Sequence, residues 1–260
     1  MSEKNSLPRI WWCCSGPFSF LPIHAAGLYS SYGPQVRLSD FTISSYIPSL
    51  SSAISCPPTE PPADFKLLVI SQPLTPGFAP LPGTREEVSN IKKHAKSLQT
   101  IILSGEEATR VAIKREAPSA PWIHAACHGL QNGTHSSLEL HDGSLSLQRL
   151  SSLTKLSQAE FAFLSACETA TGDSNLPDEA LHLAGGLHRL GYRSVIATMF
   201  SVRDQDAPFV GDKVYERLFE DERPNYRKAA QALHRAIHLL QDANGRGSFR
   251  AWAPFIHLGM

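Results

Sequence analysis

Two short motifs in this chain each place a reactive side chain just after an apolar run. His128 follows the apolar residues 122–126, and Cys167 follows the apolar residues 161–164. A cysteine thiol has an ordinary pKa near ~8.5 and is mostly protonated at neutral pH, so a nucleophilic cysteine needs a neighbouring base. The two motifs therefore indicate a histidine–cysteine dyad.

The apolar runs belong to a pattern in which short buried strands alternate with helices. The predicted strands cover residues 67–70, 101–103, 122–126, 161–165, 195–198 and 255–258. One predicted helix begins at residue 84, and four more cover 106–116, 177–190, 205–219 and 226–240. A β-hairpin is predicted over 138–145. This alternation is typical of an α/β fold with a mostly parallel central sheet and helices on both faces. The site is then expected beyond the carboxyl ends of the strands.

Composition excludes several classes of partner. The 260 residues include 24 Lys and Arg against 24 Asp and Glu, so the net charge is zero. That balance gives no electrostatic basis for binding nucleic acid or an anionic membrane surface. No apolar run approaches the ~20 residues that span a bilayer, and the first seven residues lack a signal-peptide core. Five cysteines without framework spacing fit a reducing compartment, so we expect a cytoplasmic protein.

Residues 1–63 differ from the remainder of the chain. They are rich in Ser and Pro, and the proline cluster at 57–62 predicts a linker or long surface loop. They contain apolar islands at 10–14, 23–29 and 41–50. Residues 11–12 and 43–50 predict strands, which we interpret as part of a larger sheet or as a truncated half-sheet. The expected organisation is this N-terminal part followed by a catalytic core over 64–260.

Longer strings carry a family resemblance. HAACHG at 124–129, FLSACETATG at 163–172 and PDEALHLAGGLHRLGYRSVIATMFSVRDQDAP at 177–208 resemble the CHAT domain, a cysteine-peptidase-like relative of caspases and separases. The N-terminal strings at 8–29 and 43–50 and the closing WAPFIHLG resemble fungal members. The similarity runs from Pro8 to Gly259 with a loose patch at 51–64. The chain begins close to the family's Trp-Trp strand, which leaves open a minimal stand-alone form or an incomplete gene model.

The resemblance implies a caspase-like three-layer sandwich and a cysteine endopeptidase that acts on protein or peptide substrates without cofactor or metal. Cys167 would attack the scissile carbonyl as a thiolate, and His128 would protonate the leaving amine. The N–H of Gly129, together with that of Cys167, could bind the oxyanion, and the small Ser165 would leave room for the substrate. The alternative for Cys167 is a structural thiol, since free cysteine is often buried.

Two neighbours of His128 are assigned to the core. Side chains alternate along a strand, so Cys127 cannot face the same cleft as His128 and is expected under the sheet. His124 shares the face of His128 but lies deeper. The spacing of His124 and His128 also matches a zinc-binding pair on a helix, but Ala125 stands where the catalytic glutamate of that motif belongs. We therefore expect His124 to be a core histidine.

Asp204 and Asp206 follow the fifth core strand. In separases an aspartate in a similar string lines the pocket for a basic P1 side chain, so the resemblance implies that Asp204 or Asp206 binds an Arg or Lys of the substrate. An equally weighted alternative is that they cap the next helix. Capping is also the favoured role of Asp178 and Glu179.

Two departures from the family pattern bear on activity. Phe200 stands where relatives usually have Trp, and Glu168 replaces a frequent Gln after the nucleophile. A carboxylate at Glu168 would raise the pKa of the Cys167 thiol by like-charge repulsion. The alternative function is therefore a catalytically inactive CHAT-fold interaction module with partners in a signalling or cell-death pathway.

Overall fold

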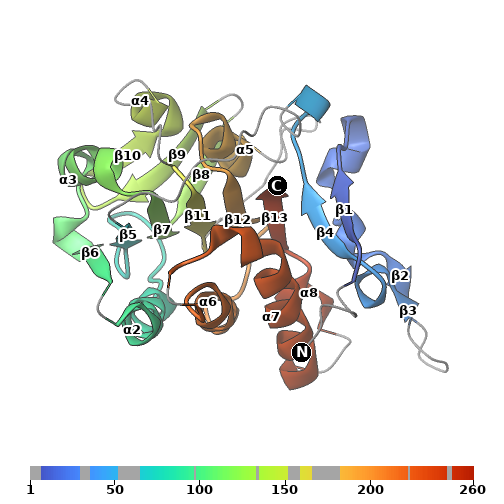
Figure 1. Ribbon diagram of the computed structural model, residues 1–260. Coiled ribbons are helices and arrows are strands. Elements are labelled where there is room, and N and C mark those ends of the chain that lie inside the picture. Colours follow the sequence, from blue (N-terminus) through green and yellow to red (C-terminus); the bar gives the residue numbers. More distant parts are fainter. Residues whose placement is uncertain are drawn as a thin grey trace.

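An eight-stranded sheet forms the centre of the computed structural model, which describes residues 7–29, 36–51, 65–96, 98–132, 135–151, 159–165, 182–221, 223–244 and 248–260 (Figure 1). In spatial order its strands are β1 (Arg9–Trp12), β4 (Ile43–Tyr46), β13 (Phe255–Gly259), β12 (Ser194–Thr198), β11 (Phe161–Leu164), β7 (Trp122–Ala126), β5 (Lys66–Ser71) and β6 (Gln99–Ser104).

The sheet is mostly parallel, as the strand–helix alternation predicts. Strands β12, β11, β7, β5 and β6 pair in parallel, whereas β13 pairs with β12 antiparallel. β13 pairs with β4, and β4 pairs with β1, both in parallel. Strands β7, β11 and β12 are buried along their whole length, which explains why they read as continuous apolar runs.

Helices cover both faces of this sheet (Figure 1). One face packs against α2 (Gly83–Ala95), α6 (Asp206–Leu218) and α7 (Ala229–Asn244), and α8 (Phe249–Trp252) packs against α7. The other face packs against α3 (Arg110–Glu116) and α5 (His182–Arg189), and α4 (Leu147–Ser151) packs against α5 and the smaller sheet that follows β7. Alternate residues of β7 enter the two cores: Trp122 packs on the α2 and α6 side and Ile123 on the α3 and α5 side.

A smaller antiparallel sheet follows β7. It consists of β8 (Gly129–Asn132), β9 (His135–Leu140) and β10 (Gly143–Ser146), and the expected hairpin on Asp142-Gly143 is confirmed. Gly143 has a positive φ of 108°, which explains glycine at this turn. The predicted start of α3 is wrong, because the helix begins at Arg110 and not at 106. Thr109 Oγ1 accepts the Ala112 N–H at 3.2 Å and so caps the helix there.

The N-terminal strands are part of the main sheet. β4 pairs with β13, and β1 pairs with β4, so the first and last segments of the chain lie side by side (Figure 1). The connecting segments contain the short strands β2 (Gly27–Leu28) and β3 (Val36–Arg37). They also contain the 3₁₀ turns η1 (Gly16–Phe20), η2 (Ile23–Ala25) and η3 (Leu38–Asp40). Further 3₁₀ turns are η4 (Gly105–Glu107), η5 (Ala117–Ser119) and η7 (Tyr226–Lys228). Among the described helices, none has the length and apolar character needed to cross a membrane.

Candidate active site

His128 lies two residues beyond β7 and is 1% exposed. Its Nε2 lies 2.8 Å from the carbonyl oxygen of Ala79, and its ring stacks on Phe78 with centroids 4.9 Å apart and planes at 26°. A carbonyl oxygen can only accept, so Nε2 carries the hydrogen. In the neutral imidazole the lone pair is then on Nδ1. The ring is therefore held in one orientation and one tautomer, as a catalytic base requires.

The segment that holds His128 is the α2 loop, residues 72–82, which joins β5 to α2. At its start, the Gln72 N–H donates to the Ala126 carbonyl at 2.8 Å, and Gln72 Nε2 donates to the carbonyls of Gly105 and Ala108. Within it, the Leu81 N–H donates to the Pro73 carbonyl at 3.0 Å. The loop is thus tied to the sheet at its start and closed on itself by backbone hydrogen bonds.

The end of the α2 loop is held from a distant part of the chain. Gly83 opens α2, and its N–H donates to Asp204 Oδ2 at 2.7 Å. The N-cap residue is Pro82, whose side chain offers no acceptor, so the cap comes from Asp204. The contact is close: a Cβ on Gly83 would lie 2.4 Å from the Asp204 carbonyl oxygen. Glycine is therefore required at this position.

The strand that leads to Cys167 is the neighbour of the strand that leads to His128. Leu164 of β11 pairs with Ala125 of β7, and the next residue, Ser165, donates its N–H to the Ala125 carbonyl at 3.1 Å. Ser165 is fully buried. Cys167, Glu168, Asp178 and Glu179 lie outside the described residues. Gly129 directly follows His128 as the first residue of β8.

The two candidate specificity residues differ in their surroundings. Asp206 is 2% exposed, and its two carboxylate oxygens accept from Arg203 Nε at 2.6 Å and Nη2 at 3.0 Å. Asp204 is partly exposed and bonds to Gly83. The expectation that these residues cap the following helix by a hydrogen bond is wrong: α6 has Gln205 at its N-cap without a side-chain bond, and Asp204 caps α2 instead. Asp206 does lie in the first turn of α6, where a negative charge is favoured.

The assignments of Cys127 and His124 to the core are confirmed. Cys127 is fully buried in the cluster on the α3 and α5 side. His124 is also fully buried, with Nδ1 3.1 Å from Tyr215 Oη and Nε2 3.1 Å from Glu87 Oε2. Burial raises the pKa of Tyr215 well above its ordinary value, and the nearby Glu87 carboxylate adds to this.

Sequence reasoning missed three residues of this site: Phe78, Ala79 and Glu87. A backbone carbonyl such as that of Ala79 leaves no trace in the sequence. Glu87 had a signal, because it lies on the buried stripe of α2 with Thr84, Ile91 and Ala95. A carboxylate on such a stripe indicates a buried polar partner.

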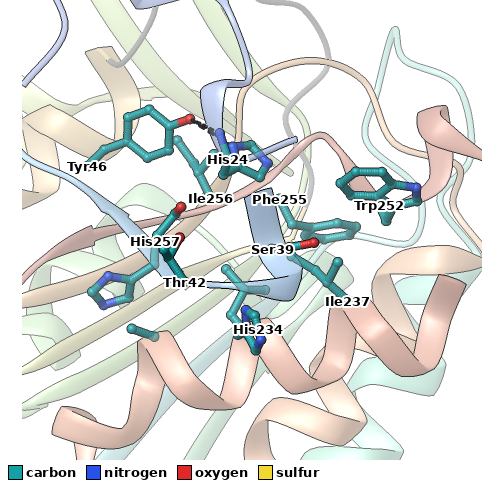
Figure 2. Close-up of a pocket in the computed structure, with 13 residues that line it drawn as sticks. His24, Ser39, Thr42, Tyr46, His234, Ile237, Trp252, Phe255, Ile256 and His257 are labelled. Carbon is teal, nitrogen blue, oxygen red and sulfur yellow. Dashed lines mark hydrogen bonds between the residues drawn. The ribbon is translucent and has the colours of Figure 1, made fainter. Parts of the chain in front are cut away.

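A cavity of about 30 Å³ lies elsewhere, between the N-terminal segment, β13 and α7 (Figure 2). His24, Tyr46, His234 and Trp252 are among its lining residues, and His24 and Tyr46 are hydrogen-bonded. Burial lowers the pKa of His24 to about 4, and burial together with His238 lowers the pKa of His234 to about 4. Strands β12 and β11 separate β13 from β7, so this cavity is not part of the His128 site.

Comparisons with known proteins bear on the family and the fold. The sequence profile of the CHAT domain matches residues 1–260. Among curated proteins, none matches the chain. The crystal structure of the Arg-specific cysteine proteinase gingipain R is similar with a TM-score of 0.55 and 14% identity, over 84% of this chain and 54% of that chain. A complex of the pro- and mature domains of RgpB from Porphyromonas gingivalis gives a TM-score of 0.49 and 15% identity, over 75% and 47% of the two chains.

The first of these likenesses confirms the expected caspase-like α/β fold. The chain spans about half the length of the gingipain chains that it matches.

Proposed function

This chain belongs to the CHAT domain family, and on that premise we propose that it is a cysteine endopeptidase that cleaves protein or peptide substrates through His128 and Cys167. The observation that carries the proposal is the fixed imidazole. Ala79 and Phe78 hold the His128 ring with Nε2 protonated, at the end of the strand next to the one that leads to Cys167. The caspase-like fold supports the same chemistry.

The tautomer decides which nitrogen does the work. His128 Nδ1 takes the proton from Cys167 Sγ, and the thiolate attacks the scissile carbonyl carbon. The C–N bond then breaks, and the imidazolium returns the proton to the leaving amine. Water hydrolyses the thioester with His128 as base, which restores the thiol and releases the acid. Nε2 carries its hydrogen in the neutral ring and in the imidazolium, so its bond to the Ala79 carbonyl persists through the cycle and stabilises the positive charge when it forms.

The oxyanion donors in this proposal are the N–H groups of Gly129 and Cys167. Gly129 directly follows the base and has no side chain to obstruct a substrate carbonyl. Loss of one such donor typically lowers kcat by about 10²- to 10³-fold. The small Ser165 leaves room beside the nucleophile.

We further propose a preference for Arg or Lys at P1, with Asp204 as the better candidate. Both oxygens of Asp206 already accept from Arg203, whereas Asp204 is partly exposed and only its Oδ2 is assigned to Gly83. Gingipain R is named for Arg specificity, but at 14% identity its likeness supports the fold alone. Fluorogenic peptides with Arg, Lys, Ala or Asp at P1 test this. Equal turnover of all four by the wild type, or unchanged turnover in both Asp204→Ala and Asp206→Ala, would remove the claim.

The central test is labelling by a thiol-directed peptide probe. Because Cys13 is exposed and could react non-specifically, the assay uses a Cys13→Ser background. We expect labelling that disappears in Cys167→Ala and persists in Cys127→Ala, since Cys127 is fully buried. His128→Gln should slow labelling and turnover by about 10²-fold or more. If no labelling depends on Cys167, the enzyme proposal is wrong and the inactive interaction module remains.

The neighbour of the nucleophile gives a further prediction. Glu168→Gln removes a negative charge beside the Cys167 thiol, so the thiol pKa should fall and labelling at neutral pH should accelerate. The measurement is the labelling rate between pH 5 and pH 9, with Glu86→Gln on the exposed face of α2 as the control. Identical profiles for wild type and Glu168→Gln would show that Glu168 does not affect the thiol. Fungal origin, a cytoplasmic location and signalling partners stay predictions.

A further inference from the structure

The α2 loop contacts His128 Nε2 through the Ala79 carbonyl, and the loop has two anchors of different kinds. At its start, Gln72 bonds to strand β7 and to the segment after β6 through three hydrogen bonds. At its end, the loop enters α2 at Gly83, whose N–H is held by Asp204. Ala79 is itself exposed, so little packing fixes its carbonyl in place.

We infer that Asp204 is a positioning residue for His128. By accepting the Gly83 N–H, its carboxylate fixes the end of the α2 loop, and the loop in turn fixes the Ala79 carbonyl and the Phe78 ring against the imidazole. This role deepens the peptidase proposal and rests on it for its catalytic consequence. It does not require that Asp204 touch substrate.

Two features make this bond suited to the role. It is short, at 2.7 Å, and joins a carboxylate to the N-terminus of a 13-residue helix, where negative charge is favoured. It also joins residues 121 positions apart, so it links the segment after β12 to the segment after β5. The ends of both strands lie at the same edge of the parallel sheet as His128. The bond therefore ties the α2 loop, which contacts His128, to the segment after β12.

The experiment compares four variants. Asp204→Ala removes the acceptor, and Asp204→Asn keeps an oxygen that can accept the Gly83 N–H. Gly83→Ala leaves the carboxylate in place but forces the two backbones apart, because its Cβ would lie 2.4 Å from the Asp204 carbonyl oxygen. Asn225→Ala is the matched control, since it removes the side-chain cap of η7 away from the α2 loop.

The direct readout is ¹⁵N NMR of the histidine side chains, with the His128 signals identified by their loss in His128→Gln. Wild type, Asp204→Asn and Asn225→Ala should show His128 with hydrogen on Nε2 only. Asp204→Ala and Gly83→Ala should show a mixture of tautomers. In kinetics with Ala or Asp at P1, where a P1 contact of Asp204 plays no part, the same two variants should lose on the order of ten- to a hundred-fold in kcat, with little change in KM. Asp204→Asn should retain most of the wild-type kcat.

Two other outcomes overturn the inference. If the His128 tautomer is the same in all variants, Asp204 does not position the ring. If Asp204→Ala loses only substrates with basic P1 residues while Gly83→Ala is fully active, Asp204 is a substrate ligand and not a positioning residue. If the wild type cleaves nothing, the peptidase proposal fails, and the NMR comparison alone decides the positioning role. If thermal unfolding shows that Asp204→Ala or Gly83→Ala does not fold, the other of these two variants alone is compared with the wild type.

Discussion

At the scale of single residues, a buried pair of polar side chains, Glu87 and His124, supports the elements that hold His128. Glu87 is 3% exposed and His124 is fully buried, and they meet at 3.1 Å beneath β7. Burial of such groups is unfavourable unless each finds a partner, so each member of the pair depends on the other. The pair also joins α2 to β7, the two elements that bring Ala79 and His128 together.

Glu87→Ala is therefore expected to destabilise the fold by about 1–3 kcal/mol, because it leaves the buried Nε2 of His124 without a polar partner. The adjacent Glu86 is exposed on the same helix, and Glu86→Ala should change the free energy of unfolding by less than about 0.5 kcal/mol. Urea unfolding of both variants measures the difference. Equal stabilities would show that the Glu87–His124 contact contributes nothing.

At the scale of elements, continuous apolar runs were the reliable guide. β5, β7, β11 and β12 appear within two residues of their predicted limits, because strands buried on both faces must be apolar throughout. β8 was not predicted, since Gly129–Asn132 lacks an apolar alternation. The pairing of β4 with β13 was also beyond the sequence, because it joins opposite ends of the chain. His128 was predicted because it follows an apolar run. Its link through the α2 loop to Asp204 was not, because that link joins residues far apart in the chain.

The end of α5 illustrates an element whose limit the sequence does specify. Gly191 has φ 110°, its N–H donates to the His188 carbonyl, and the Tyr192 N–H donates to the Leu187 carbonyl. This pair of bonds is the Schellman motif, in which the residue after the helix is left-handed. The helix predicted over 177–190 therefore ends within one residue of its predicted limit.

Two glycine variants on α5 should act in opposite directions. Gly191→Ala is expected to cost about 1 kcal/mol, because alanine is strained at this φ. Gly185→Ala, inside the helix with its nearest neighbouring atom 4.0 Å from the added Cβ, should stabilise by about 0.5–1 kcal/mol. Thermal unfolding of the two variants tests both signs. A stabilising Gly191→Ala would contradict the cap.

At the scale of the whole molecule, the N-terminal segment covers an edge of the sheet that would otherwise be open. β4 pairs with β13, and side chains reinforce the contact: Arg9 donates to the Gly259 carbonyl at 3.1 Å, and Trp11 Nε1 donates to the same oxygen at 3.1 Å. Uncovered strand edges invite pairing with other chains. The first strands of this chain therefore cover the edge of the sheet at β13.

Histidines at this contact should make the fold sensitive to acid. His24 Nε2 donates to the Ala253 carbonyl at 3.0 Å and Nδ1 accepts from Tyr46 Oη at 2.8 Å, so the buried ring is neutral. Burial lowers its pKa from 6.5 to about 4. Between these values the unfolded chain binds a proton that the folded chain does not, so stability falls as the pH is lowered from about 6.5 to about 4. Below about 4 both states are protonated and this contribution no longer changes. The loss from His24 is at most about 3 kcal/mol, and His234 adds to it in the same window.

The variant that isolates this effect is His24→Gln, which keeps a donor and an acceptor but does not titrate. It should be less stable than the wild type at pH 7, because glutamine cannot reproduce both bonds of the ring, and its stability should fall less steeply between pH 6.5 and pH 4. His141→Gln, at the partly exposed β9–β10 turn, should keep the wild-type slope. Urea unfolding at half-unit steps of pH measures the three slopes. A His24→Gln slope equal to that of the wild type would show that protonation of His24 does not cause the loss of stability in acid.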